Sequence, residues 1–151
     1  MSASHAPFDR EVARVLRGAG WHDGWSIDAQ VEQWQRTLSP DFELFPAARE
    51  ALERFGGIRV EQEAPGEDCK RETFDLDPSL ALGEEDRFRS FEPLISGKLY
   101  PLGEAGAGHA FLAISERGEV YALMHDLWLV GRSIDDALER LIRGRHLQKL
   151  T

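Results

Sequence analysis

Two apolar runs joined by a short turn constrain the fold of this chain more than any other feature. Residues Ala110–Ser115 and Glu119–Met124 are each long enough for one strand, and Glu116-Arg117-Gly118 lies between them. Glycine can adopt the positive φ that a tight turn requires, and only antiparallel strands can be joined so closely. The pattern therefore predicts a β-hairpin, with Leu127–Val130 as a third strand of the same meander.

Helical spacing of apolar residues dominates the rest of the chain. It predicts helices over residues 8–19, 28–38, 46–55, 84–96 and 133–143. Shorter strands are expected at residues 58–60, 73–76 and 99–102, a polar turn region at 61–70 and frayed backbone at 145–151. Because the helices must bury their apolar faces on the meander, the expected fold class is α+β. We predict a mainly antiparallel sheet with N-terminal helices and a C-terminal helix packed on it.

The length and the cysteine content point to one domain in a reducing compartment. The chain has 151 residues, so we expect a single domain over residues 1–151 with an ordered core at about 8–144. Cys69 is the only cysteine, and a lone thiol fits the cytoplasm better than a secreted protein. The first residues lack the basic start and apolar run of a signal peptide, and no apolar stretch approaches the length of a membrane span. We therefore expect a cytoplasmic protein that does not contact membranes.

Negative charge is concentrated in the middle of the chain. The formal net charge is −9, and residues 41–100 hold fifteen acids against eight bases, which accounts for −7 of it. Within this block, residues 61–86 hold ten acids and two bases. Such a balance argues against direct binding of nucleic acid, which requires a basic face. It suits either a basic partner protein or simple solubility.

The residues that could carry chemistry lack suitable neighbours in the sequence. His125-Asp126 could belong to a small hydrolase, but adjacent strand residues point to opposite faces, which opposes a direct relay. Lys70 and Arg71 could lower the pKa of the Cys69 thiol, yet no histidine lies near it in the sequence. The glycine-rich segment 103–108 leads into a strand, whereas a phosphate-binding loop leads into a helix. Since no two histidines have metal-ligand spacing, we expect no catalytic residue, no metal and no cofactor.

The order of several motifs resembles the third immunity-protein subfamily of the SUKH superfamily. These motifs lie within residues 8–21, 42–60, 99–103, 114–121 and 129–144. The most specific of them is Phe42–Val60, which holds Phe45-Pro46 and Gly56-Gly57. In that subfamily the first helix is usually followed by Trp, one residue and Pro-Gly-Arg. Here Trp21 is followed by His22-Asp23-Gly24-Trp25, so that Trp25 stands in place of the arginine.

The resemblance implies a SUKH-like α+β fold without catalytic residues. It also implies a bacterial antidote that binds and neutralises a cognate polymorphic toxin, many of which are nucleases or deaminases. A nuclease must present cations to its substrate, so an acidic antidote would suit it and would meet it faster. The partner-binding residues that we expect are Glu61, Glu63, Glu67, Asp68, Glu72, Asp75, Asp77 and Trp25. An aromatic anchor is also expected in this patch, with Phe74 and Phe88 as candidates if they are exposed.

Two other functions stay open at the level of the sequence. A non-toxin protein-binding or regulatory module could use the same fold, and a small hydrolase would use His125 and Asp126. The tryptophans do not decide between these functions. Trp34 and Trp128 are expected in the core, whereas Trp21 and Trp25 lie in a predicted loop where burial and partner contact are equally compatible with the sequence.

Overall fold

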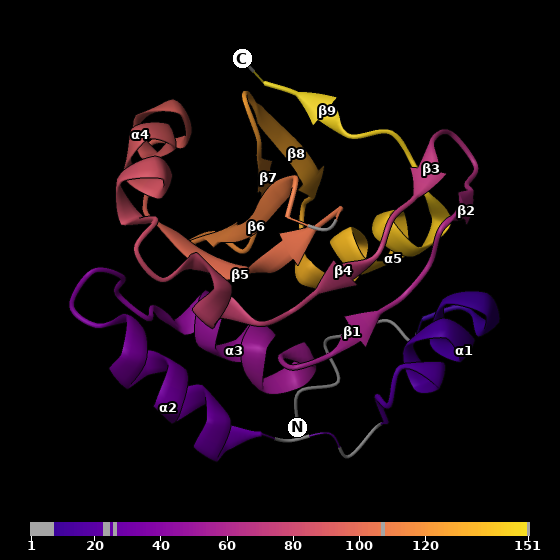
Figure 1. Ribbon diagram of the computed structural model, residues 1–151, viewed down its shortest axis with the longest axis horizontal. Coiled ribbons are helices and arrows are strands. Elements are labelled where there is room, and N and C mark those ends of the chain that lie inside the picture. Colours follow the sequence, from indigo (N-terminus) through magenta and orange to yellow (C-terminus); the bar gives the residue numbers. More distant parts are fainter. Residues whose placement is uncertain (1–7, 23–24, 26, 107, 151) are drawn as a thin grey trace.

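The computed structural model describes residues 8–22, 25, 27–106 and 108–150, which form five α-helices, a 3-10 helix and nine strands (Figure 1). The helices are α1 (Arg10–Gly18), α2 (Asp28–Leu38), α3 (Pro46–Phe55), η1 (Pro78–Ala81), α4 (Glu85–Ile95) and α5 (Ile134–Arg143). The strands are β1 (Arg59–Val60), β2 (Ala64–Pro65), β3 (Lys70–Arg71), β4 (Phe74–Asp75), β5 (Leu99–Ala105), β6 (Ala110–Ser115), β7 (Val120–Leu123), β8 (Leu127–Gly131) and β9 (Gln148–Lys149). None of the described helices has the length and apolar character needed to span a bilayer.

Seven strands form one sheet in the order β1-β4-β5-β6-β7-β8-β9, and every neighbouring pair is antiparallel. The predicted hairpin lies at its centre, where Ile114 is paired with Val120 and Phe111 with Leu123. Strand β8 completes the predicted meander, and β2 and β3 form a separate small hairpin. The expected α+β class with a mainly antiparallel sheet is therefore confirmed.

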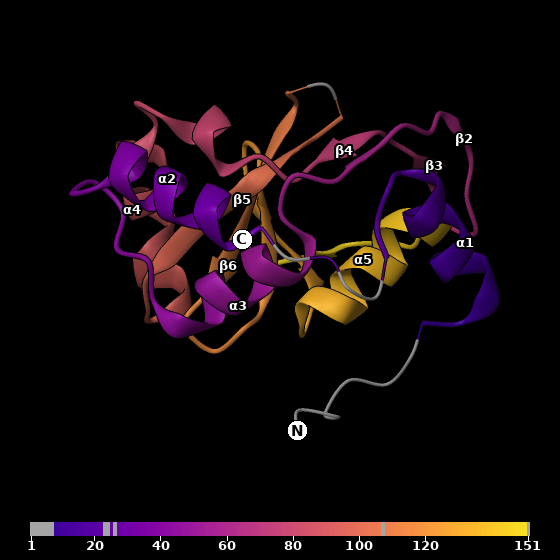
Figure 2. The same ribbon diagram turned by 90° about the horizontal axis from the view of Figure 1, so that it is seen from below.

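Helices cover both faces of the sheet because its central strands are apolar on both sides. The ring of Phe111 on β6 lies 5.6 Å from that of Phe88 on α4. The next residue, Leu112, lines a small apolar hollow together with Leu141 of α5. Adjacent residues of a strand point to opposite faces, so α4 and α5 pack on opposite sides of β6. Figure 2 shows the two helices well apart, with the strands between them.

The last helix has the ends that its sequence predicts. The Ser133 hydroxyl accepts a hydrogen bond from the Asp136 backbone N–H at 3.1 Å, and the Asp136 carboxylate accepts one from the Arg132 backbone N–H at 3.0 Å. The first bond satisfies a donor that the helix start leaves without a partner, and the second fixes the backbone of the residue before the N-cap. Gly144 ends the helix in the left-handed conformation, with φ of 68°.

Three segments differ from the sequence prediction. Residues 145–151 were expected to fray, but Trp128 of β8 pairs with Lys149, so the expectation is wrong for the described part of this segment. The strand predicted at residues 99–102 extends through Ala105. The polar stretch 61–70 contains strand β2 and the start of β3, which pair with each other. In the first two cases a partner strand from elsewhere in the chain supplies backbone hydrogen bonds that local sequence patterns do not reveal, whereas β2 and β3 pair only with each other as a local hairpin.

One glycine brings β4 and β5 close together. Gly103 has φ of 153°, and a Cβ atom there would lie 1.8 Å from the backbone oxygen of Asp75. The absence of a side chain therefore allows β4 to pair with the end of β5. This pairing places Asp75 directly opposite Glu104, and the two carboxylates become part of the surface described below.

Candidate partner-binding surface

The acidic residues that the sequence analysis singled out separate into two regions. The first, here called the hairpin clamp, joins residues 67–69 of the β2–β3 turn to residues 143–146 after α5. The second, here called the sheet-face groove, is a hollow of about 470 Å³ over β1, β4 and β5. Its lining residues are Arg59, Glu61, Gln62, Glu63, Thr73, Phe74, Asp75 and Glu104.

Backbone hydrogen bonds attach the hairpin clamp to the end of α5. The Glu67 N–H donates to the Arg143 carbonyl at 2.9 Å, and the N–H groups of Asp68 and Cys69 both donate to the Gly144 carbonyl at 2.9 Å. The last carbonyls of a helix have no partner within the helix. The β2–β3 turn therefore serves as a tertiary cap for the C-terminus of α5.

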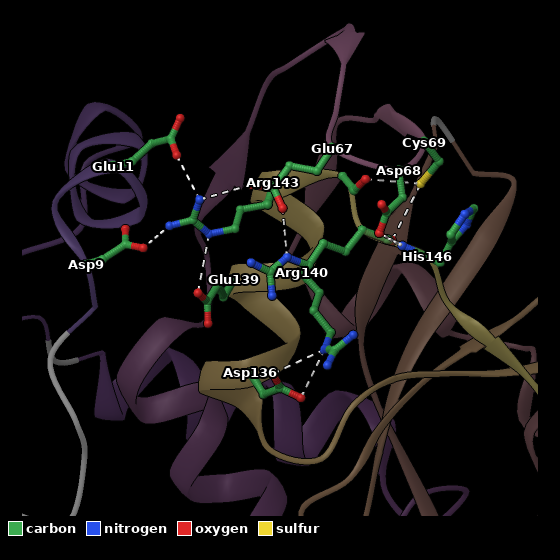
Figure 3. A network of polar contacts seen from close by, with 12 residues as sticks. Asp9, Glu11, Glu67, Asp68, Cys69, Asp136, Glu139, Arg140, Arg143 and His146 are labelled. Carbon is green, nitrogen blue, oxygen red and sulfur yellow. Dashed lines mark hydrogen bonds and ion pairs between the residues drawn. The ribbon is translucent and has the colours of Figure 1, made fainter.

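Side-chain charges reinforce the hairpin clamp around Arg143 (Figure 3). Its guanidinium pairs with Asp9, with Glu11 at 2.9 Å, with Glu67 at 3.2 Å and with Glu139 at 3.3 Å. The Arg143 side chain is only 13% exposed, so these interactions are partly shielded from solvent. One arginine thus ties α1, the β2–β3 turn and α5 together.

The other acids of the turn are also engaged within the molecule. A second ion pair joins Glu67 to Arg145 at 3.0 Å, and the Asp68 carboxylate accepts a hydrogen bond from the His146 backbone N–H at 3.1 Å. Glu67 and Asp68 were expected to contact a partner. The structure places both in contacts that hold the chain's own C-terminal segment.

Cys69 has the opposite electrostatic environment from the one that its sequence neighbours suggested. Burial raises the pKa of the Cys69 thiol, and the nearby carboxylates of Asp68 and Glu72 raise it further. The thiol donates to the carbonyls of Gly144 and Arg145, each at 3.5 Å. Lys70 and Arg71 therefore do not lower this pKa, which agrees with the expectation that Cys69 is not a nucleophile. A thiol that stays protonated is a poor nucleophile.

The sheet-face groove holds like charges side by side. Arg59 is opposite Asp75 on β4, and Asp75 is in turn opposite Glu104 on β5. The Arg59 guanidinium contacts Asp75 at 3.1 Å and Glu61 at 3.6 Å. The Glu104 carboxylate has no hydrogen bond or ion pair with any described residue. Like charges directly opposite each other on a sheet are destabilising, so this position costs the free protein stability.

The sheet-face groove is open and acidic. Four of its lining side chains are carboxylates and one is a cation, Arg59. Glu63 is exposed and lies 3.5 Å from the ammonium of Lys70. Figures 1 and 2 show α5 on one side of β4 and no described helix over the other. The groove therefore presents a net negative charge to solvent in a position that a basic protein could approach.

The remaining expected site residues have local structural roles or lie apart from this groove. The Asp77 carboxylate accepts hydrogen bonds from the backbone N–H and the hydroxyl of Ser79 at the start of η1. The Trp25 indole N–H donates to the Gly56 carbonyl at 3.2 Å, and that of Trp21 donates to the Arg54 carbonyl at 3.2 Å. Glu72 is exposed beside Gly106. Asp23 and Gly24, in the segment where the chain departs from the subfamily pattern, lie outside the described residues.

The aromatic anchors suggested by the sequence are not available to a partner. Phe74 and Phe88 are 1% and 0% exposed and belong to the core. Two charged residues of the groove, Arg59 and Glu104, were not among the expected site residues. Glu104 lies in the glycine-rich segment that was expected to be a loop after the strand. Simple strand alternation would have placed Glu104 with the buried Tyr100 and Leu102, and it is the register shift between Pro101 and Gly103 that breaks this pattern.

The structure does not assemble catalytic partners around His125. This histidine is exposed in the bend between β7 and β8, and the carboxylate of Asp126 lies 3.4 Å from the Lys149 ammonium. Within the described ranges, no group of three or more His, Cys, Asp or Glu side chains is arranged to hold a metal ion.

The described residues form an α+β fold with open polar hollows and dispersed histidines, and a fold of this class does not by itself define a function. Comparison with known proteins gives a more specific result. The model of the SUKH-3 immunity protein family matches residues 8–144, and the chain belongs to this family. The resemblance noted in the sequence is thereby confirmed over the same range. No curated protein and no solved structure matches the chain.

Proposed function

We propose that this chain is an antidote that neutralises a cognate bacterial toxin in the cytoplasm by protein–protein contact. Its membership of the SUKH-3 immunity protein family carries the proposal. The proposed toxin is basic, as a nuclease or a nucleic-acid deaminase must be in order to hold its substrate. Neutralisation by contact requires no chemistry from the antidote.

The sheet-face groove supports electrostatic attraction of such a toxin. Its carboxylates outnumber its cations by three, and Glu104 lacks a partner among the described residues. Surface charge of this kind accelerates the encounter of two proteins, and the acceleration weakens as salt shortens the Debye length to about 8 Å. Among the expected site residues, we retain Glu61, Glu63 and Asp75 as the primary candidates for this role and add Glu104.

The function is tested by protection of cells. The gene neighbourhood is first searched for a toxin, and the toxin domain found there is expressed in a sensitive host with and without the chain. Protection by the wild type is expected. His125→Ala and Cys69→Ser should protect equally well, because neither residue has an assembled catalytic partner. Survival that requires His125, in a variant shown to be folded, would favour the hydrolase alternative, whereas absence of protection by the wild type would refute the proposal.

The role of the groove is tested by the association rate with the purified toxin domain. A variant with Glu61→Lys, Glu63→Lys and Glu104→Lys raises the formal net charge from −9 to −3, since each reversal adds two units. A matched control with Glu32→Lys, Asp41→Lys and Asp86→Lys makes the same change at exposed positions outside the groove. At low salt, we expect roughly a tenfold slower association for the groove variant and a smaller change for the control. Equal rates for both variants would show that net charge alone steers the toxin.

A further inference from the structure

Charge accelerates encounter, but tight binding needs a buried anchor. Hot spots are large side chains that fill desolvated pockets, and they dominate the dissociation rate. The two phenylalanines that the sequence offered as anchors are buried in the core. An anchor can instead come from the partner, provided that this chain has a hollow to receive it. The inference below rests on the proposed function, because it concerns the toxin's contribution to the same complex.

A hollow of about 820 Å³ lies between α3, the β6–β7 turn and the start of α5, and we call it the α3–α5 groove. Phe8 and the first residues of α3, Pro46 and Ala47, contribute accessible apolar surface to its lining, whereas Ile114 and Ile134 lie beneath it and are 1% and 8% exposed. Its volume lies within the range typical of ligand pockets, about 300–1,000 Å³. The groove is therefore large enough to enclose a long side chain from a partner.

Most carboxylates around the α3–α5 groove already have cationic partners within the chain. Asp135 pairs with Arg54 at 2.9 Å and Asp136 with Arg140 at 3.2 Å. Asp9 and Glu139 both pair with Arg143, as described above. These four groups are held in place and contribute little free charge.

Two carboxylates of this groove differ from the others. Glu50 on α3 is exposed and has no hydrogen bond or ion pair with any residue that the structure describes. Glu116 in the β6–β7 turn accepts a hydrogen bond from the Lys98 backbone N–H at 3.1 Å through Oε1, and no cation is paired with it in the described ranges. Each lines the same hollow as the apolar surface. The groove thus combines apolar contact with two carboxylates that form no direct ion pair among the described residues, although the Lys98 ammonium lies near enough to Glu116 to attract it.

The cations of the lining do not remove this negative excess. The lining holds six acids and three arginines. Arg54 is bound to Asp135 and lies 4.6 Å from the Phe55 ring centroid. Arg117 donates to the Ile95 carbonyl at 2.7 Å and pairs with Glu119. Only Arg132 has a guanidinium without a contact among the described residues, and one cation cannot balance both free carboxylates.

We propose that the α3–α5 groove receives an arginine side chain presented by the toxin. The aliphatic stem of arginine covers apolar surface, and its planar guanidinium donates paired hydrogen bonds to carboxylates. Lysine has only a compact ammonium, and an aromatic side chain would leave Glu50 and Glu116 without a cation. Arginine matches the apolar lining and can donate paired hydrogen bonds to the carboxylates, which lysine cannot do in the same planar geometry, and it is among the residue types enriched at hot spots.

The chemistry of the groove is tested first with a small probe. Nα-acetyl-arginine amide is titrated into the ¹⁵N-labelled full chain. Two analogues serve as control probes: the citrulline analogue lacks the positive charge, and the lysine analogue lacks the planar guanidinium. We expect saturable shifts at residues 47–51, 116–118 and 132–135 with a Kd on the order of millimolar, no saturation with citrulline and at least severalfold weaker binding of lysine. Glu50→Gln with Glu116→Gln should abolish saturation, and Glu32→Gln on α2 should not. Equal shifts with citrulline, or shifts confined to other surfaces, would overturn the assignment.

The same variants are then tested with the toxin domain. The Glu50→Gln, Glu116→Gln variant is expected to raise the dissociation rate about tenfold or more with a nearly unchanged association rate. The sheet-face variant described above should do the opposite. If the wild type protects cells while the groove variant dissociates at the wild-type rate, the groove assignment fails and the proposed function stands. If the wild type gives no protection, the proposed function fails, and the arginine titration still decides what the groove binds.

Discussion

The hairpin clamp and the sheet-face groove take most of their acids from one acidic stretch, yet the fold uses them in opposite ways. Residues 61–86 hold ten acids and two bases. In the hairpin clamp, Glu67 meets two arginines that come from the far end of the chain. In the sheet-face groove, Asp75 shares a single arginine with Glu61 and faces a second carboxylate across the strands.

The difference shows that negative charge along a sequence does not predict negative charge on a surface. Acids that meet a partly buried guanidinium hold elements together, and removing one partner exposes the other to an unfavourable environment. Carboxylates that repel one another lower the stability of the free protein, and they remain free to bind a cation on a partner protein. The predictions that follow test whether the two regions differ in this way, beginning with the largest expected effect.

Arg143→Ala should cause the largest loss of stability. It removes the one cation that Asp9, Glu11, Glu67 and Glu139 share, and it leaves four carboxylates close together. Because the guanidinium is only partly buried, we expect a loss of about 2–3 kcal/mol, at or below the range for broken buried pairs. Urea denaturation measures it. A change below about 0.5 kcal/mol would show that the clamp is an ordinary surface network.

Glu67→Gln should weaken the hairpin clamp without removing its backbone hydrogen bonds. Glu67 pairs with both Arg143 and Arg145, but it is 42% exposed, so we expect a loss of about 0.5–1 kcal/mol after allowance for solvent screening. Glu63→Gln is the matched control, since Glu63 is 70% exposed and contacts only Lys70. Hydrogen exchange at residues 67–69 provides a local measurement. Equal effects of the two variants would contradict a special role for the clamp.

Glu104→Gln should change stability in the opposite direction. It removes the charge that lies opposite Asp75 while keeping nearly the same shape. We expect a gain of about 0.2–1 kcal/mol, the range of cross-strand pair effects. The midpoint of urea denaturation at low salt measures the gain, which should shrink at 1 M salt, where the Debye length is about 3 Å. A loss of stability at low salt would mean that Glu104 has a stabilising contact. The carboxylates of both regions would then stabilise the folded protein.

The smallest effect concerns the Cys69 thiol within the hairpin clamp. Its pKa is raised in the folded protein, so the protonated thiol is favoured by folding. The stability from this preference is complete below the pKa of the unfolded thiol and is lost as pH rises through the folded pKa. Alkylation by iodoacetamide should therefore reach half its maximal rate at a higher pH in the folded chain than in urea. A lower pH in the folded chain would show that Arg71 or Lys70 outweighs Asp68 and Glu72.

Local sequence patterns identified the elements of this fold better than they identified its surface. The hairpin of β6 and β7 and the five helices follow from apolar spacing, and glycines mark the ends of α1, α3 and α5. The pairing of β9 with β8 and the continuation of β5 to Ala105 did not follow, because a short polar or glycine-rich segment becomes a strand only when another strand meets it. The burial of Phe74 likewise depends on which face of β4 meets the core.

The sequence by itself determined the fold class, the family and the acidic excess, because these depend on composition, periodicity and the order of motifs. Only the tertiary structure decided which acids face a cation. The partners of Glu67 lie 76 and 78 positions away, and Glu104 meets Asp75 through the approach that Gly103 permits. Coulomb energies depend on distance in space and on burial, and neither can be obtained from separation along the chain.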